Sequence, residues 1–133
     1  MPKLPKRARP RVLEDDVTKA ARTELARANV LHWRNNVGAT RNPHGQLVRY
    51  GLCDGSADLI ACVETELSCP SCGVKLPPIG RFVGIELKAP TNHAWSDEQR
   101  AWAGLVEKHH GVYGLVFSGS EIVHVLQRAR SVW

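Results

Sequence analysis

The chain has 133 residues, and its apolar content of 43% suffices for the core of one domain. No apolar run is long enough to cross a bilayer, and the basic start lacks the apolar core of a signal peptide, so we expect a cytoplasmic protein without a membrane partner. The formal net charge is +5 at pH 7, from 18 Lys and Arg against 13 Asp and Glu. This surplus favours a polyanionic partner such as nucleic acid without excluding other partners.

Residues 1–11 combine basic side chains with three prolines. Because proline removes backbone donors and like charges repel, we predict a disordered arm. Such an arm can follow a phosphate backbone by releasing counterions, or it can serve only solubility. The candidate DNA contacts in it are Lys3, Lys6, Arg7, Arg9 and Arg11.

Apolar residues at helical spacing predict a helix over residues 13–32. The stripe consists of Leu13, Val17, Ala20, Ala21, Leu25, Ala28 and Leu31. Glu14 lies at the border of this stripe and Glu24 lies within it. A carboxylate beside an apolar stripe costs desolvation energy unless it has a partner, so either glutamate is a candidate metal contact. The alternative is a glutamate with its stem on the apolar surface and its charge in water.

The middle of the chain alternates strand patterns with Gly- and Pro-rich segments. We predict a strand and loop over 33–38, a short strand over 47–52, a strand over 58–63, a long hairpin connection with a cysteine insertion over about 62–80, and a central strand over 81–89 that Pro90 ends.

The last third begins with Ser96 and Gln99 in a capping-box pattern, which predicts a helix over 97–109. Trp102, Leu105 and Val106 are its predicted buried residues. A strand over 112–117 follows, and then a final helix or, alternatively, a strand over 122–126. The order α-β-β-β-α-β-(α) predicts an α/β fold with a central mixed sheet flanked by helices.

Two of these predicted strands carry charged residues in an arrangement that suggests a metal site. Asp58 begins one strand, and Glu86 and Lys88 are separated by one residue on the central strand, so they point to the same face of the sheet. Two carboxylates on neighbouring strands beside an ammonium group suit metal-assisted phosphodiester hydrolysis, and their oxygens favour Mg²⁺ or Mn²⁺. The alternative is a solvated strand face, which a central strand of a mixed sheet rarely has.

Five motifs occur in a fixed order: Glu14 in the opening helix, residues 34–38 (RNNVG), residues 55–58 (GSAD), Glu86-x-Lys88 and Ser96-x-x-Gln99. Together they resemble the VRR-NUC domain, a branch of the PD-(D/E)xK nuclease superfamily, over residues 13–126. This resemblance implies a restriction-endonuclease-like core. Ala57 departs from the superfamily pattern, which has a proline before the first aspartate.

The resemblance also implies roles for single residues. The implied metal ligands are Glu14, Asp58, Glu86 and the backbone carbonyl of Leu87. Lys88 is implied to orient the attacking water, and Gln99 to lie near the substrate phosphate. A purely structural role in the capping box accounts for Gln99 equally well. Arg34 and Asn36 are further candidate DNA contacts. For Asn35 and Asn36, bonding of loop backbone is the alternative.

As a stand-alone domain of phage type, the chain is expected to act as a homodimer on branched or four-way-junction DNA in a bacterial host cell. Two sites related by a two-fold axis can cut paired strands symmetrically. The candidate interface residues are Ile122, Val125, Leu126 and Trp133. The alternatives are a nucleic-acid-binding module with an inactive metal site, and a sequence-specific restriction-type nuclease, for which little chain remains to form recognition insertions.

The four cysteines lie within twenty residues of one another. Cys69 and Cys72 are three apart, a spacing that lets two thiolates chelate one tetrahedral zinc ion. Cys62 is a candidate third ligand, whereas Cys53 lies beyond the strand that carries Asp58. A second Cys-x-x-Cys pair is missing, so reduced thiols or a site shared between two subunits are alternatives to a structural Zn²⁺ within one chain.

Overall fold

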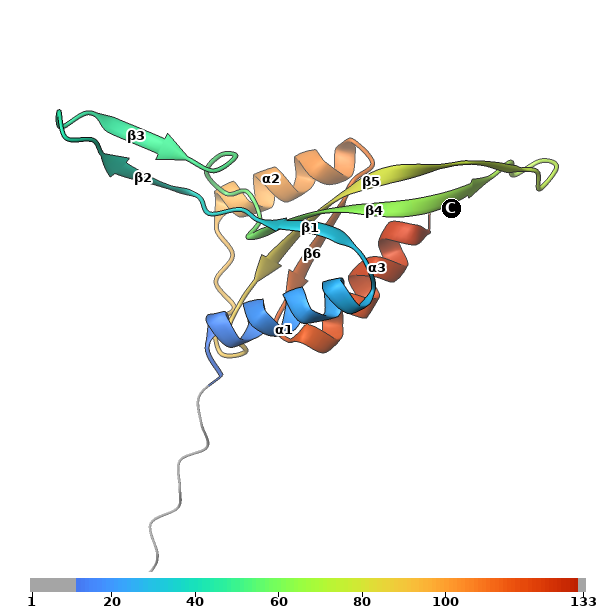
Figure 1. Ribbon diagram of the computed structural model, residues 1–133, viewed down its shortest axis with the longest axis horizontal. Helices are drawn as coiled ribbons and strands as arrows, with labels where there is room; N and C mark the ends of the chain where they lie inside the picture. The colour runs from blue at the N-terminus through green and yellow to red at the C-terminus, as the bar shows by residue number, and fades with distance from the viewer. Residues whose placement is uncertain (1–11, 132–133) are drawn as a thin grey trace, which may run out of the picture.

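The computed structural model describes residues 12–131. The predicted basic arm, with its five candidate DNA contacts, lies outside these residues, as does Trp133. In chain order the elements are α1 (Glu14–Arg27), β1 (Leu31–Arg34), β2 (Gly38–Arg41), β3 (Leu47–Tyr50), β4 (Leu59–Ser68), β5 (Lys75–Leu87), α2 (Asp97–Lys108), β6 (Val112–Val116), the short 3-10 helix η1 (Gly119–Glu121) and α3 (Ile122–Arg130) (Figure 1).

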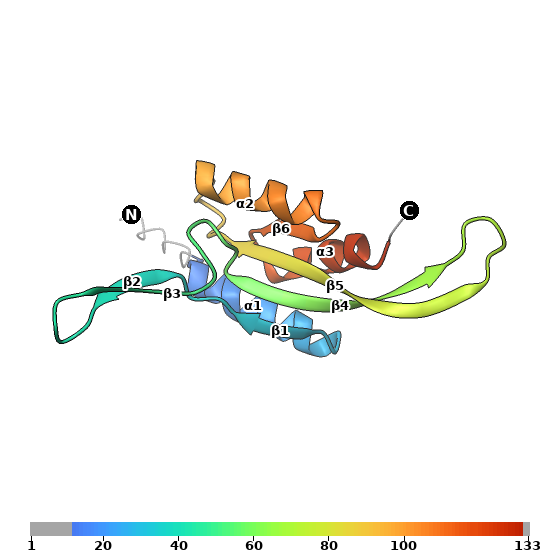
Figure 2. The same cartoon turned by 90° about the horizontal axis from the view of Figure 1, so that it is seen from above.

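The central sheet has four strands in the order β1-β4-β5-β6. β4 pairs antiparallel with β1 and β5, while β5 and β6 run parallel, so the sheet is mixed. Apolar residues of α1 and α3 pack on one face, and α2 packs on the other (Figure 2). The predicted α/β class with helices flanking a mixed sheet is therefore confirmed.

The main core lies between the sheet and the helix pair α1 and α3. Alternate residues of β4 and β5 enter it because successive strand side chains point to opposite faces. The core residues of α1, β4, β5 and α3 are Val17, Ala21, Leu25, Leu59, Ala61, Val63, Val83, Ile85, Leu87, Ile122, Val125, Leu126 and Ala129. The proposed use of Ile122, Val125 and Leu126 as a dimer interface is therefore wrong, since these side chains are buried in the chain's own core.

The first helix ends earlier than predicted. Asn29 adopts the left-handed conformation with φ 54°, the Val30 N–H donates to the Leu25 carbonyl, and the Asn29 N–H donates to the Ala26 carbonyl. This is the Schellman pattern, and asparagine tolerates its left-handed position. Leu31 consequently lies in β1 instead of continuing the helical stripe.

The segment predicted as a long hairpin connection is mostly strand. β4 and β5 pair as far as Ser68 and Lys75, with an irregularity between Thr65 and Leu67, and form an arm that extends beyond the sheet (Figure 1). β6 pairs with β5 only from Val83 onward, so the outer part of β5 has one free edge. Pro77 and Pro78 lie opposite the irregularity between Thr65 and Leu67. Successive backbone nitrogens point to opposite edges, so one proline faces the free edge and the other faces the interrupted part of the ladder, and neither position needs a backbone donor.

The predicted burial of α2 is only partly correct. Trp102 and Val106 are half-buried, but Leu105 is 56% exposed, and the buried residue is Ala103. A small side chain at the contact lets the helix approach the sheet closely. Among residues 12–131, no helix combines the length and apolarity needed to cross a bilayer.

Two helix leucines test this assignment of the core. We expect Leu25→Ala to lower the free energy of unfolding by about 2–5 kcal/mol, because Leu25 is fully buried and its loss leaves a cavity. Leu105→Ala on α2 is the matched control and should change the free energy of unfolding by less than about 0.5 kcal/mol. Urea titration measures both, and equal effects would contradict the assignment.

Candidate metal and nuclease site

The sheet brings the three central predicted residues together. Leu59 pairs with Ile85, which places Asp58 beside the end of β5. The Leu87 N–H donates to Asp58 Oδ2 over 2.8 Å, and Lys88 Nζ lies 3.2 Å from Glu86 Oε1. The prediction that Glu86 and Lys88 share one face of the strand is confirmed by this contact.

A network of hydrogen bonds holds the turn that presents Asp58. Asn35 Nδ2 donates to Ser56 Oγ over 2.9 Å and to the Ala57 carbonyl over 2.8 Å, and the Asn35 N–H donates to the Asp58 carbonyl. Gly55 has φ 82°, and a Cβ there would collide with the backbone of Glu98. Bonding to loop backbone is thus confirmed for Asn35, and the glycine allows the turn to touch α2.

Gln99 completes the predicted capping box and also contacts Glu86 and Lys88. Its backbone N–H donates to Ser96 Oγ over 3.1 Å and its Oε1 accepts the Ser96 N–H over 3.0 Å, which completes the capping box. Its Nε2 donates to Glu86 Oε1, and its Oε1 lies 3.5 Å from Lys88 Nζ. The cap of α2 therefore also orients the glutamate and the lysine.

The surroundings of Glu86 and Asp58 disfavour the state in which both carboxylates are ionised. Burial, followed by the negative charge of Asp58, raises the pKa of Glu86 to about 7, although Lys88 opposes the shift. Burial also raises the pKa of Asp58, against the Leu87 N–H and the charges of Lys88 and Arg34. Among the described residues, Glu86 Oε2 is buried without a hydrogen-bond partner. A cation at this oxygen would offset the cost of burying the charge.

The donor set fits a hard divalent cation. Asp58 and Glu86 supply carboxylate oxygens, and the N–H and C=O of a strand residue point to the same edge, so we expect the Leu87 carbonyl to face Asp58 as well. No cluster of three or more His, Cys, Asp or Glu side chains within residues 12–131 is arranged as a complete metal centre. Backbone oxygen and water would therefore have to complete the shell, as is common for Mg²⁺.

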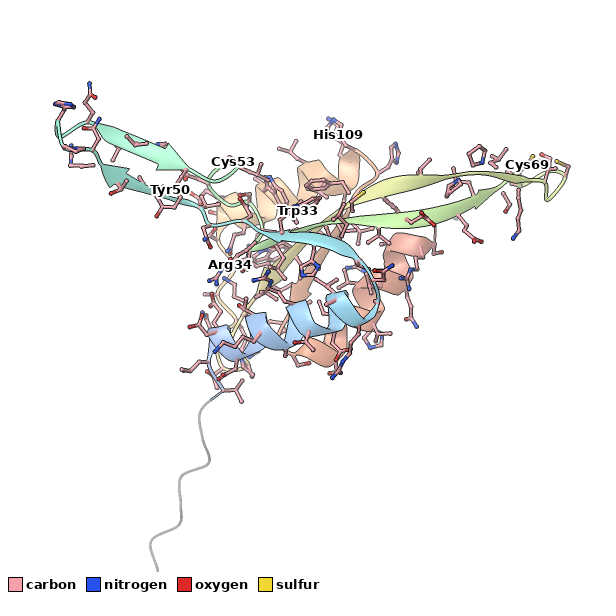
Figure 3. All side chains as sticks on the ribbon, viewed as in Figure 1. Trp33, Arg34, Tyr50, Cys53, Cys69 and His109 are labelled. Carbon is pink, nitrogen blue, oxygen red and sulfur yellow. The ribbon has the colours of Figure 1, made fainter. Side chains whose placement is uncertain are left out.

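Two neighbouring cavities share Asp58. One of about 450 Å³ is lined by Glu86, Gln99 and the turn before Asp58. The other, of about 400 Å³, is lined by Glu14, Arg34 and Asn36. The structure thus brings the predicted DNA contacts of β1 and its following loop to the rim of the site (Figure 3).

The structure separates the two glutamates of the first helix. Glu14 lines a cavity with Asp58, and its charge contributes to the raised pKa of Glu86. Glu24 pairs with Arg27 at 2.9 Å on the outer surface. Glu14 is therefore the acid near the site, although its side chain is exposed, and Glu24 takes no part.

Tyr113, Trp95 and Trp102 form an aromatic cluster near the carboxylates that was not predicted from the sequence. Tyr113 is buried, its hydroxyl accepts from Trp95 Nε1 over 3.3 Å, and its ring lies 6.0 Å from that of Trp102. Burial raises the pKa of Tyr113 to about 12, with smaller contributions from the charges of Glu86 and Asp58. A tyrosine in a buried strand is indistinguishable from an ordinary core residue in sequence, so no pattern marked it.

The proposed zinc set of Cys62, Cys69 and Cys72 is wrong as a set within one chain. Cys62 lies opposite Phe82 in the body of the sheet, whereas Cys69 lies at the outer end of the β4–β5 arm (Figure 3). At about 3.3 Å per residue, seven residues of extended strand separate them by roughly 23 Å. Only Cys69 and Cys72 remain together.

Comparison with protein-family models, curated proteins and solved structures finds no match. A function for this chain therefore has to be argued from the chemistry of the site.

The pKa of Glu86 predicts how stability depends on pH. Between the ordinary value of 4.5 and about 7, the folded protein holds a proton that the unfolded chain has released. The free energy of unfolding of the metal-free protein should therefore fall as the pH rises through this window. Glu86→Gln should flatten the dependence and, near pH 8, raise the stability by up to about 3 kcal/mol.

Urea titrations in chelator between pH 4 and 8 measure this effect, with Glu24→Gln as the matched control. Equal pH dependence of the wild type and Glu86→Gln would show that the buried carboxylate is not the cause.

Proposed function

We propose that the protein is a divalent-metal-dependent DNA endonuclease of the VRR-NUC type. The observation that carries the proposal is the Glu86 carboxylate. It is 3% exposed, one of its oxygens has no hydrogen-bond partner among residues 12–131, and the charges of Lys88 and Asp58 lie near it. Burial of this group is costly in a protein without a cation, and metal-assisted hydrolysis accounts for both the acids and the amine.

Each residue of the site has a separate role in the proposed reaction. Asp58, Glu86 and the Leu87 carbonyl would hold Mg²⁺ or Mn²⁺, which when bound lowers the pKa of water and stabilises charge on the phosphate. Lys88 Nζ, fixed by Glu86 at 3.2 Å and by Gln99 at 3.5 Å, orients the attacking water or the phosphate oxygen. Glu14 would contribute from the rim through water.

DNA is the substrate that the charge distribution favours. Arg34 lies at the rim of the site, and the β2–β3 hairpin beside it carries Arg41 and Arg49, of which Arg49 pairs with Asp54 at 2.9 Å. The chain also has a basic segment over residues 1–11, whose five Lys and Arg account for the whole net charge of +5. Lysine and arginine near phosphates supply sequence-independent affinity, as a structure-selective enzyme requires. Branched or four-way-junction DNA, cut by a homodimer, is the substrate class that the VRR-NUC resemblance implies.

A nucleic-acid-binding module with an inactive site is the second candidate. It is favoured by the exposure of Glu14, which among residues 12–131 leaves the buried Glu86 and the half-buried Asp58 as the acids at the centre of the site. The same basic surfaces would serve this module, so binding alone does not separate the two candidates.

Carboxylate variants separate them. Glu86→Ala and Asp58→Asn should each lower Mg²⁺- or Mn²⁺-dependent cleavage by more than about 100-fold, because removal of a ligand exceeds the effect of disturbing a neighbouring contact. DNA binding should persist. Glu24→Ala is the matched control, because Glu24 lies outside the site, and this variant should cleave DNA like the wild type.

Cleavage of a labelled junction on denaturing gels and binding by fluorescence anisotropy measure these two properties. A wild type that binds but never cuts with either metal would favour the module, and cleavage by Glu86→Ala at the wild-type rate would refute the site.

The proposed structure selectivity has its own test. On a panel of linear duplex, splayed, flap and four-way substrates of equal length, we expect the branched substrates to be cut at least about 10-fold faster at equal salt. Equal rates on linear and branched DNA would contradict the selectivity but not the nuclease chemistry.

A further inference from the structure

The tip of the β4–β5 arm has the geometry of half a zinc site. Residues 69–74 connect the two strands in a tight turn, in which the Cys69 N–H donates to the Val74 carbonyl and the Gly73 N–H donates to the Cys69 carbonyl, both over 2.8 Å. Gly73 has φ 71°, a conformation that glycine adopts without strain. The turn thus holds two cysteines of a Cys-x-x-Cys pair on one short loop.

Both cysteines of this turn have free thiols, and Cys72 is exposed while Cys69 is half-buried. Zinc binds cysteine as the thiolate, so a pair of free thiols on one turn is suited to hold the metal from one side.

A structural zinc needs four ligands, and one arm supplies two. No third His, Cys, Asp or Glu joins them among residues 12–131. The arm extends away from the body of the protein, so its tip is open to another molecule (Figure 2). We propose that the Cys69–Cys72 tips of two copies of this chain meet and bind one Zn²⁺ through four thiolates.

The surroundings of the tip favour a second copy as the partner. Apolar side chains near it are exposed, with Val74 at 58%, Leu76 at 45% and Ile79 at 44%, and two such arms would cover one another. Four thiolates around Zn²⁺ leave a doubly negative centre, and Lys75 is the only charged residue between Leu67 and Gly80. Two copies therefore bring two lysines, which matches the charge of the centre, and two identical ligand pairs suit a closed two-fold contact.

This inference does not depend on the nuclease activity, because its test measures metal content and mass. The full chain, purified with Zn²⁺, should contain one zinc per two chains by elemental mass spectrometry and should have the mass of a dimer by light scattering. A zinc chelator should halve the mass. Co²⁺ in place of zinc should show the visible bands of a tetrahedral thiolate site.

Cys72→Ser should lose the zinc and the dimer, while Cys53→Ser, which removes another exposed thiol, should keep both. Circular dichroism checks that each variant is folded. One zinc per chain on a monomer, no zinc at all, or a dimer that survives both the chelator and Cys72→Ser would overturn the proposal.

Discussion

The burial of the Glu86 carboxylate between β5 and the first turn of α2 is the interaction to which the rest of the site is adapted. A carboxylate that is 3% exposed costs free energy unless other groups balance its charge. Lys88 and Gln99 contact one of its oxygens, and the other oxygen has no partner among the described residues. The nearby charge of Asp58 increases the cost. The pKa of Glu86 is raised to about 7 by this cost, and the cation that we propose would offset it when bound.

The two faces of the sheet serve different purposes. The face toward α1 and α3 is apolar and contains the main core, so it holds β4 and β5 in register. The face toward α2 has small residues at the contact: a Cβ on Gly84 would collide with Trp102, and Ala57 is fully buried. Because α2 can approach closely there, its capping residue Gln99 reaches Glu86. The main core and the candidate site thus lie on opposite faces of the same strands.

Two hairpins extend beyond this body, the β2–β3 hairpin beside the site and the outer part of β4 and β5 on the other side (Figure 1). Both carry exposed apolar residues, among them Leu47 and Tyr50 on the first and Val74 and Leu76 on the second. A two-stranded hairpin is marginally stable without packing on one face, so both hairpins are suited to gain stability from a partner. Arg41 and Arg49 on the first hairpin agree with the polyanionic partner that we propose, and the cysteines of the arm agree with the proposed contact between two copies of the chain.

The sequence by itself determined the α/β class and the shared face of Glu86 and Lys88, because side-chain alternation on a strand has a period of two and follows directly from position. The pairing of β4 with β5 then placed Asp58 beside them. The sequence also predicted the capping box at Ser96 and Gln99, which is a local interaction. Helical phase placed Glu14 and Glu24 on or beside the same stripe, and only the packing of α1 decided that Glu14 lies near the site while Glu24 pairs with Arg27. The contact between Gln99 and Glu86, the burial of Tyr113 and the separation of Cys62 from Cys69 likewise depend on how distant segments pack and on how far the strands continue. Spacing along the chain contains no such information, since it records order and periodicity but not which helix lies over which strand.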